Sequence, residues 1–385
     1  YGSLPGMKGK FDKTAAKGVR HIDLNFAFDR LDSPAGLSLP DLLRIERAID
    51  DGTMPSFGFG LAHWKAPVTA KKTAALKEWI SDYRRTFYPN GNAPQFADEP
   101  ICVIPDESPL PVDPAKASLG EKLFNDTRLS LDNTLSCASC HLLEKYGVDN
   151  EQVSDGVAGA VGTVNAPTVF NSVFNFVQFW DGRAETLAQQ AAGPPVNPVE
   201  MASESFDQII AKLTADKAFM KEFGMVYSEV TESTITDAIE HYERTLITPN
   251  GRFDRYLKGE TDAIDADELA GYALFKEHNC SGCHSGVIAG GESYEFMGLK
   301  NDYFAERVSE EIVDDNGHFS VTGNPYDLHR FKVPGLRNVA HTWPYFHDGT
   351  RNTLEEAVSD MAWYQNGIKL SESDVAKITA FLKTL

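Results

Sequence analysis

Two short runs of cysteine and histidine are the residues whose types and spacing most directly indicate a chemistry. Each run is a Cys-x-x-Cys-His motif, and the motifs occupy residues 137–141 and 280–284. Two thiols at this spacing form thioethers with the vinyl groups of a haem, and the imidazole that follows ligates the iron from one side. The sequence therefore predicts two covalent haem c groups. The attaching residues would be Cys137, Cys140, Cys280 and Cys283, and the proximal iron ligands His141 and His284.

A zinc site made from the same four cysteines is the alternative interpretation. Roughly 140 residues separate the two pairs, whereas the cysteine pairs of structural zinc sites lie much closer together. Zinc would also not require a histidine after both pairs. In addition, similar apolar stretches, residues 119–124 and 269–275, precede the two motifs. The repeated arrangement favours two cytochrome-like units.

Composition limits the class of protein. The chain has 385 residues, enough for two or three domains with cores of their own, and a formal net charge of −20. This acidity argues against a nucleic-acid partner and suits a basic electron donor or simple solubility. With four cysteines assigned to haem, only Cys102 is left, so no disulfide framework is expected.

The haem motifs also predict a compartment. Haem c is normally attached on the outer face of an energy-transducing membrane, so we expect a periplasmic protein. The sequence has no stretch of about 20 apolar residues. Its first residues lack the pattern of a signal peptide, so a signal or an inner-membrane anchor would lie upstream of Tyr1.

Helical signals predict a mainly α fold. We expect helices over residues 40–49, 69–80, 113–124 and 233–247, and a closing helix capped by Ser371. The expected domains are a small helical N-terminal module that ends in a linker (1–110), a first haem domain (111–260) and a second haem domain (261–385). The linker prediction covers residues 90–115, which are rich in proline and acidic residues. His241, inside a predicted helix, is interpreted as structural.

A methionine in a tight turn lies between the first two predicted helices. Met54 follows Gly52 and precedes Pro55. Many small cytochromes present a sixth iron ligand from such a turn, whereas a core methionine is the simpler interpretation. The spacing alone favours the core methionine and leaves the ligand open.

The most specific pattern follows the first motif. It comprises residues 165–168, 178–184, 190–194 and 198–201, and it resumes at residues 331–361. Over these runs the sequence resembles the bacterial dihaem cytochrome c peroxidase family. The resemblance implies two cytochrome c-like domains that face each other. It also implies reduction of hydrogen peroxide to water by two electrons.

The resemblance assigns roles around the first haem. It makes His141 the proximal ligand of the peroxidatic haem, Glu200 the distal carboxylate and Gln190 the distal amide. Trp180 would lie between the two haems. A carboxylate at this point takes a proton from peroxide and returns it to the leaving oxygen. Taken singly, Glu200 also fits a helix-start acid, and Trp180 a core aromatic residue.

Around the second haem, Met361 matches the family's thioether ligand opposite His284. A soft, neutral sulfur favours ferrous iron, which suits a haem that collects electrons. In the related enzyme that matures the tryptophan cofactor of methylamine dehydrogenase, a tyrosine takes this place. Met361 therefore favours peroxide reduction over oxidation of a protein substrate. A core methionine, and a dihaem cytochrome that only transfers electrons, are the alternatives.

The family resemblance implies two further features. A calcium ion would lie between the haems, held by the Asn165 side chain and the main-chain carbonyls of Thr342 and Pro344. His347 would contact haem rather than ligate iron. Many members also carry a distal histidine that caps the peroxidatic iron until the other haem is reduced. Val157 stands at that place here, so we expect an open iron and no need for reductive activation.

Residues 18–24 and the Met54 turn resemble the haem-binding module of the three-haem peroxidases. The family's third Cys-x-x-Cys-His motif would lie upstream of Tyr1, so a third haem c is expected only if that motif exists. The electron donor would be a small cytochrome c, a cupredoxin or a quinol. Membrane association through an upstream anchor and a homodimer are further expectations from relatives.

Overall fold

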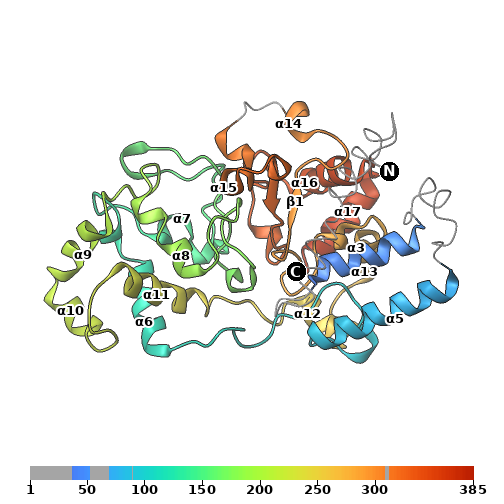
Figure 1. Ribbon diagram of the computed structural model, residues 1–385, viewed down its shortest axis with the longest axis horizontal. Helices are drawn as coiled ribbons and strands as arrows, with labels where there is room; N and C mark the ends of the chain where they lie inside the picture. The colour runs from blue at the N-terminus through green and yellow to red at the C-terminus, as the bar shows by residue number, and fades with distance from the viewer. Residues whose placement is uncertain (1–36, 53–68, 89, 308–311) are drawn as a thin grey trace, which may run out of the picture.

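The computed structural model describes residues 37–52, 69–88, 90–307 and 312–385 of the chain. The fold is mainly helical, as expected, and many of its helices are short (Figure 1). A two-stranded antiparallel sheet pairs β1 (Tyr294–Phe296) with β2 (Arg330–Lys332). The helices are α3 (Leu39–Asp50), α5 (Ala70–Phe87), α6 (Pro114–Phe124), α7 (Cys137–Cys140), α8 (Leu187–Ala191), α9 (Phe206–Thr214), α10 (Lys217–Phe223), α11 (Glu232–Glu243), α12 (Arg252–Leu257), α13 (Ala266–Glu277), α14 (Tyr303–Glu306), α15 (Phe319–Thr322), α16 (Leu354–Met361) and α17 (Glu372–Leu382).

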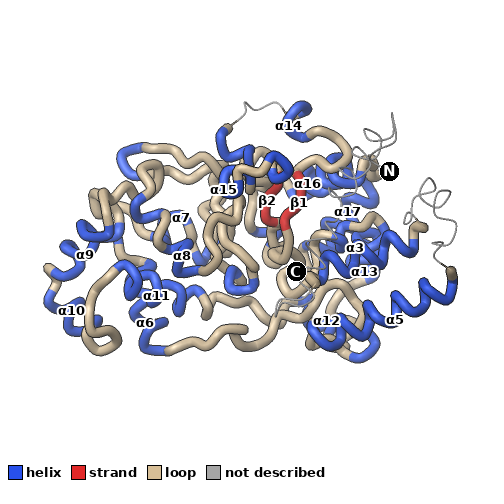
Figure 2. The backbone as a smooth tube through the Cα atoms, viewed as in Figure 1, coloured by secondary structure: helices blue, strands red, loops and turns tan. Residues whose placement is uncertain are grey.

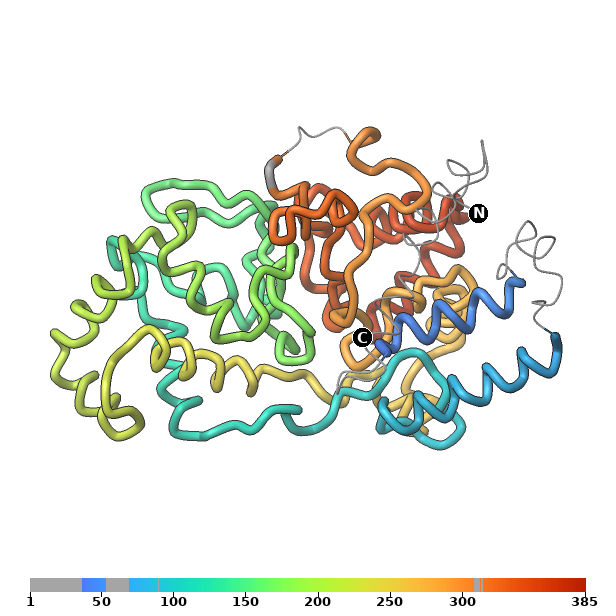
Figure 3. The backbone as a smooth tube through the Cα atoms, in the orientation of Figure 1, coloured from blue at the N-terminus to red at the C-terminus, as the bar shows by residue number. Residues whose placement is uncertain are grey.

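The helices gather into two halves on opposite sides of the molecule (Figures 1 and 3). Helices α6 to α11 surround the first Cys-x-x-Cys-His motif, and α12 to α17 surround the second. Long loop segments connect the short helices of the first half (Figure 2). Within the described ranges, no helix is both long and apolar enough to cross a membrane.

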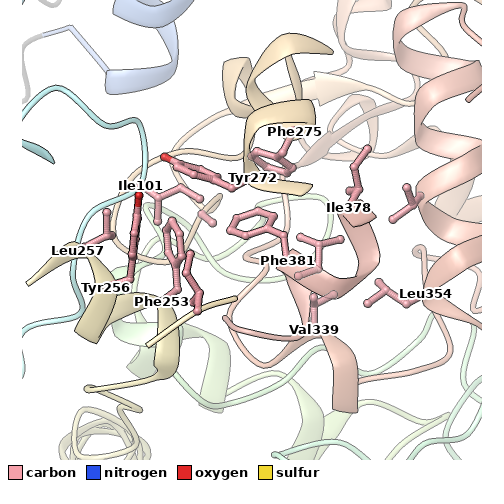
Figure 4. Packing of buried hydrophobic residues seen from close by; sticks show 14 of the residues in the cluster. Ile101, Phe253, Tyr256, Leu257, Tyr272, Phe275, Val339, Leu354, Ile378 and Phe381 are labelled. Atoms are coloured by element: carbon pink, nitrogen blue, oxygen red, sulfur yellow. The ribbon is translucent and has the colours of Figure 1, made fainter. Parts of the chain in front are cut away.

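A packed pair of helices forms the centre of each half. In the first half α6 packs on α11, and buried Phe124 meets Tyr242 edge to face. In the second half α13 packs on α17, and the rings of Tyr272 and Phe381 lie 4.9 Å apart (Figure 4). The closing helix α17 follows Ser371, the predicted cap, whose side chain accepts a hydrogen bond from the main-chain N–H of Asp374. These pairs supply the apolar burial that holds each half together.

Each helix pair crosses at a glycine. A Cβ atom on Gly120 would lie 1.9 Å from the carbonyl oxygen of Ala238, and one on Gly271 would lie 1.9 Å from that of Lys377. Only glycine permits this close approach of two backbones. The two glycines occupy matching places in the apolar stretches that precede the haem motifs. The similarity of those stretches therefore reflects one helix crossing used twice.

The predicted linker over residues 90–115 is partly core, so that prediction was wrong for residues 101–104. All four of these residues are buried, and Ile101 packs in the aromatic core of the second half (Figure 4). The N–H of Cys102 donates to the carbonyl oxygen of Gly286 at 3.0 Å. A continuous apolar run outweighs the flanking prolines here, because it buries its side chains and pairs its backbone at the same time.

The N-terminal helices largely agree with the sequence. Helix α3 has the predicted bounds within one residue, but α5 runs from its cap Thr69 to Phe87 instead of ending near residue 80. Its inner face continues because the Tyr83 hydroxyl accepts a hydrogen bond from the N–H of Leu37 at 2.8 Å, and Arg84 is buried. Tertiary contacts thus lengthen a helix whose apolar pattern ends earlier.

The helix predicted over residues 233–247 ends at Glu243. The N–H of Asn171 donates to the carbonyl oxygen of Leu246 at 2.7 Å, and the N–H of Thr248 donates to the Asn171 side chain at 2.9 Å. The N–H groups of Thr245 and Leu246 donate to carbonyls only three residues back, and the bonds to the distant loop hold the chain that follows the helix. The sequence pattern of the helix contains no sign of them.

Replacing Gly120 by alanine is expected to destabilise the first half, because the added Cβ would overlap the Ala238 carbonyl oxygen. Helix α6 would have to move away from α11, and overpacking of this kind costs about 1–3 kcal/mol. The measurement is the free energy of unfolding of the holo-protein. Gly251→Ala is the control, since its Cβ would meet its nearest neighbour at an ordinary 3.7 Å. Equal losses from both substitutions would contradict the explanation.

Candidate active site

The first motif forms a single helical turn, α7, and His141 follows it directly. The ring nitrogen Nδ1 of His141 lies 3.2 Å from the carbonyl oxygen of Gly147. When Nδ1–H donates to that oxygen, Nε2 keeps the free lone pair that an iron ligand needs. Burial lowers the pKa of His141 and so favours the neutral ring.

The second motif presents its histidine in the same way. Nδ1 of His284 lies 3.2 Å from the carbonyl oxygen of Ala289, and burial lowers the pKa of His284 to about 4. The cysteines of both motifs are free of disulfides and available for thioether bonds. Both motifs therefore fit covalent haem with one neutral imidazole ligand each.

A cavity of about 1300 Å³ adjoins the second motif. Cys280, Cys283 and His284 line it, and so does Met361, the last residue of α16. Pockets for drug-sized ligands usually measure about 300–1,000 Å³, so this cavity has room for a haem. The structure thus brings together in one space every residue predicted for the second haem, and the donor set fits His/Met ligation.

The three predicted calcium ligands, Asn165, Thr342 and Pro344, line the same cavity. The Asn165 side-chain amide donates to the carbonyl oxygens of Glu151 at 3.0 Å and Gln152 at 3.4 Å, which leaves its Oδ1 as a free acceptor. Among the described residues there is no cluster of three or more acidic, histidine or cysteine side chains suited to a metal ion. Amide and carbonyl oxygens are nevertheless ligands that calcium accepts.

Glu200, the predicted distal carboxylate, is half-buried. Burial raises the pKa of its carboxyl group, while the positive charge of Arg183 and a hydrogen bond with the Asn197 side chain oppose the rise. The charge of Glu200 also reaches the first motif, where it adds to the burial that raises the pKa of Cys137 and Cys140. Glu200 therefore lies within electrostatic reach of the first haem site.

Val157 lies next to this carboxylate residue. The valine is buried, and its N–H donates to the main-chain carbonyl oxygen of Glu200 at 2.8 Å. Val157, at the position where many family members carry a capping histidine, is therefore hydrogen-bonded to the backbone of the predicted distal carboxylate residue. Its own side chain is apolar.

Trp180 lies on a loop, residues 178–184, whose ends form an antiparallel bridge. Its indole N–H donates to the carbonyl oxygen of Asn165 at 2.9 Å, and its own carbonyl accepts from the N–H of Lys332 on β2 at 2.9 Å. The tryptophan lines the cavity of the second motif. Arg183, three residues further on, acts on the distal carboxylate. One short loop therefore reaches both haem sites.

Gln190 is half-buried on α8, and its carbonyl oxygen accepts a hydrogen bond from the N–H of Gly193. In the turn that follows α8, the carbonyl oxygen of Pro194 accepts a hydrogen bond from the N–H of Met201, the residue after Glu200. Main-chain hydrogen bonds therefore connect the segment of Gln190 to the segment of Glu200.

Two histidines differ in their surroundings. His347 lines the large cavity, and its Nε2 lies 2.8 Å from a buried carboxylate oxygen of Asp315. His241 accepts a hydrogen bond from the N–H of Asp113 at the start of α6, which is a structural contact. Met54 and residues 18–24 lie outside the described residues.

Comparison with known proteins identifies the family. The family models Di-haem cytochrome c peroxidase and Cytochrome c match residues 114–262 and 269–385. The cytochrome c peroxidase Ccp of Escherichia coli (strain K12) is 45% identical over 387 residues, which cover 100% of this chain and 82% of that protein. This chain belongs to the di-haem cytochrome c peroxidase family. It is an oxidoreductase of the peroxidase class with two haem c groups.

Other relatives cover less of the chain. The cytochrome c551 peroxidase of Nitrosomonas europaea is 46% identical over 292 residues, 75% of this chain and 84% of that protein. The methylamine utilization protein MauG of Methylorubrum extorquens is 31% identical and covers 73% of this chain and 81% of its own. A crystal structure of a MauG-like protein associated with microbial copper homeostasis, 29% identical, has a TM-score of 0.63 and covers 74% of this chain and 93% of its own.

Sequence reasoning missed Arg183 and Asn197, the two side chains that oppose the rise in the pKa of Glu200. Both lie within or beside the runs that carried the family resemblance, so their position was visible. The sequence did not indicate that the Arg183 charge and the Asn197 amide act on Glu200, because this effect depends on how the 178–184 loop folds back. The Gly182 turn was the available signal.

Replacing Arg183 by glutamine is expected to raise the pKa of Glu200 further, because it removes the positive charge that opposes the effect of burial. A base must be ionised to accept a proton, so the acid limb of the pH profile of kcat/KM should move to higher pH. Arg255→Gln is the matched control, since Arg255 is an exposed arginine paired with Glu260. An acid limb that moves equally in both variants, or not at all, would contradict this assignment.

Proposed function

We propose that this chain reduces hydrogen peroxide to water at the first haem, with electrons that enter at the second haem. One observation carries the proposal: the half-buried carboxyl group of Glu200 has a raised pKa and lies within electrostatic reach of the first motif. A protein that only carries electrons has no use for a proton-transferring group beside its haem. The names of the relatives from Escherichia coli and Nitrosomonas europaea support the same reaction.

The protein's own part in the chemistry is proton transfer. Bound at the two motifs, the haems supply the iron that binds peroxide and the path by which electrons arrive. Glu200, as the carboxylate, takes a proton from one peroxide oxygen and returns it to the other, so that water leaves rather than hydroxide. The amide of Gln190 hydrogen-bonds peroxide and orients it for this transfer. General acid/base catalysis of this kind is worth about 10²–10⁴ in rate.

His284 and Met361 would hold the second haem and His141 the first, and electrons would pass from the second haem to the first by way of Trp180. The position of Trp180 supports this route, because the residue lines the cavity of the second motif while its loop also carries Arg183, which acts on Glu200. Met361 itself argues against oxidation of a protein substrate, since a thioether favours the ferrous state.

A small c-type cytochrome is the proposed electron donor, and the periplasm is the proposed compartment. The name of the Nitrosomonas europaea relative, cytochrome c551 peroxidase, supports a cytochrome donor. Covalent haem attachment supports the periplasm. A cupredoxin or a quinol is the alternative donor, and steady-state rates with each purified donor distinguish the three.

No histidine stands at position 157 to cap the first iron, so turnover would require no reductive activation. Support comes from buried Val157 beside Glu200 and from the absence of any histidine between His141 and His241 in the sequence. An apolar side chain cannot ligate iron.

Oδ1 of Asn165 and the carbonyl oxygens of Thr342 and Pro344 would hold a calcium ion between the two haem sites, with water as the further ligand. The support is that all three residues line one cavity and that hydrogen bonds fix the Asn165 amide. Because Asn165 also accepts the indole N–H of Trp180, the ion would order the segment that connects the haems.

The decisive experiment measures peroxide turnover by the enzyme as isolated, without pre-reduction, with one artificial donor. The parent is expected to turn over at once, and Glu200→Gln to lose at least about tenfold in kcat/KM, because the amide cannot shuttle the proton. Glu185→Gln, an exposed glutamate, serves as the control. If neither parent nor mutant turns over under any condition, the chain is an electron carrier.

Val157→His tests the open iron in the same assay. The new imidazole is expected to cap the iron, so the variant should be slow until the second haem is reduced, while the parent is fast from the start. A parent that itself needs pre-reduction would show that another ligand caps the first iron.

Removal of calcium with a chelator is expected to lower peroxide turnover, and added calcium should restore it better than magnesium, which demands a stricter octahedral site. Asn165→Ala should require more calcium for half-maximal recovery than the parent. Asn250→Ala, outside the cavity, is the control. Full activity in the chelated parent would remove calcium from the proposal.

A further inference from the structure

Helix α3 of the N-terminal module lies directly against the second haem motif (Figures 1 and 3). Its residues Ile45, Ala48 and Ile49 line the same cavity as Cys280, Cys283 and Met361. The haem pocket of the second half is therefore completed by a segment that comes from the other end of the chain.

The contact centres on one arginine. Nε of Arg44 donates to the carbonyl oxygen of Gly282 at 3.2 Å, and Nη2 lies 3.4 Å from Sγ of Cys283. The same Nη2 forms an ion pair with Oε2 of Glu295 on β1 at 3.0 Å. Glu295 is in turn 3.9 Å from the Cys283 sulfur. A complete pair of opposite charges thus touches the sulfur that becomes a thioether to haem.

This pair is largely shielded from water. The side chains of Arg44 and Glu295 are 15% and 8% exposed. Charges interact several times more strongly in such surroundings than in water, so each of them acts on the haem nearby. Arginine also stays protonated throughout the working pH range, which makes its charge a fixed one.

We propose that Arg44 is a positioning residue that docks the N-terminal module on the second haem and raises the reduction potential of that haem, with Glu295 as the opposing charge. Ferric haem carries one more positive charge than ferrous haem, so a nearby cation destabilises the ferric state. A nearby carboxylate stabilises it. The inference rests on attachment of haem at Cys280 and Cys283, as in the proposed function.

The test is a redox titration of the holo-protein at pH 8, followed by the absorption of the second haem. Arg44→Gln is expected to shift the ferrous-to-ferric ratio at a fixed potential about tenfold toward ferric, which is 59 mV for one electron. Glu295→Gln should shift it toward ferrous, and the double variant should lie between the two. Arg85→Gln, an exposed arginine on α5, should leave the ratio unchanged.

Arg44→Lys separates charge from packing, because it keeps the charge but loses the fork of hydrogen bonds. A potential close to that of the parent supports the inference, and a shift as large as that of Arg44→Gln overturns it. Shifts of the two single glutamine variants in the same direction, or no shift in either, overturn it as well.

Mass spectrometry of the same samples distinguishes failure of the haem assignment from failure of the role proposed for Arg44. If Cys280 and Cys283 carry no haem, the haem assignment fails and the inference fails with it. If haem is attached and the potentials do not move, only the role of Arg44 is wrong, and the peroxidase proposal stands.

Discussion

A chain of three hydrogen bonds, two of which cross between the two halves of the molecule, links the segments around the two haem sites. The N–H of Asn165 donates to the carbonyl oxygen of His347, the indole of Trp180 donates to the carbonyl oxygen of Asn165, and the N–H of Lys332 donates to the carbonyl oxygen of Trp180. All four residues that make these bonds also line the cavity of the second motif. The two bonds that cross between the halves join main-chain atoms, so the spacing of the sites depends little on surface side chains.

The sequence was most informative where function and local structure use the same few residues. Cys-x-x-Cys-His motifs, the cap at Ser371 and the helix that follows Asp113 are all decided by neighbours in the chain, and the structure has them as predicted. The family resemblance also led to Met361, which lines the cavity of the second motif, and to Glu200, whose charge acts on the cysteines of the first motif.

What the sequence did not reveal depends on contacts between distant segments. Asn171 holds the chain that follows α11, and the burial of residues 101–104 requires the second half. Arg44 and Glu295 are 251 positions apart in the sequence, and only the fold pairs them. Patterns of periodicity and capping carry no information about such pairs, since each member satisfies the local rules on its own.

The burial of residues 101–104 has a consequence for the way the protein forms. These residues precede the first haem domain, yet they complete the core of the second, where Ile101 pairs with Gly286. The first haem domain is therefore an insertion into the second, and the two strands of chain that enter and leave it touch where Asn250 donates to Asp106. The first domain is one continuous segment and can close its core from its own residues. The second core needs residues 101–104 together with the C-terminal helices, so distant parts of the chain must meet before the second Cys-x-x-Cys-His motif has its full surroundings.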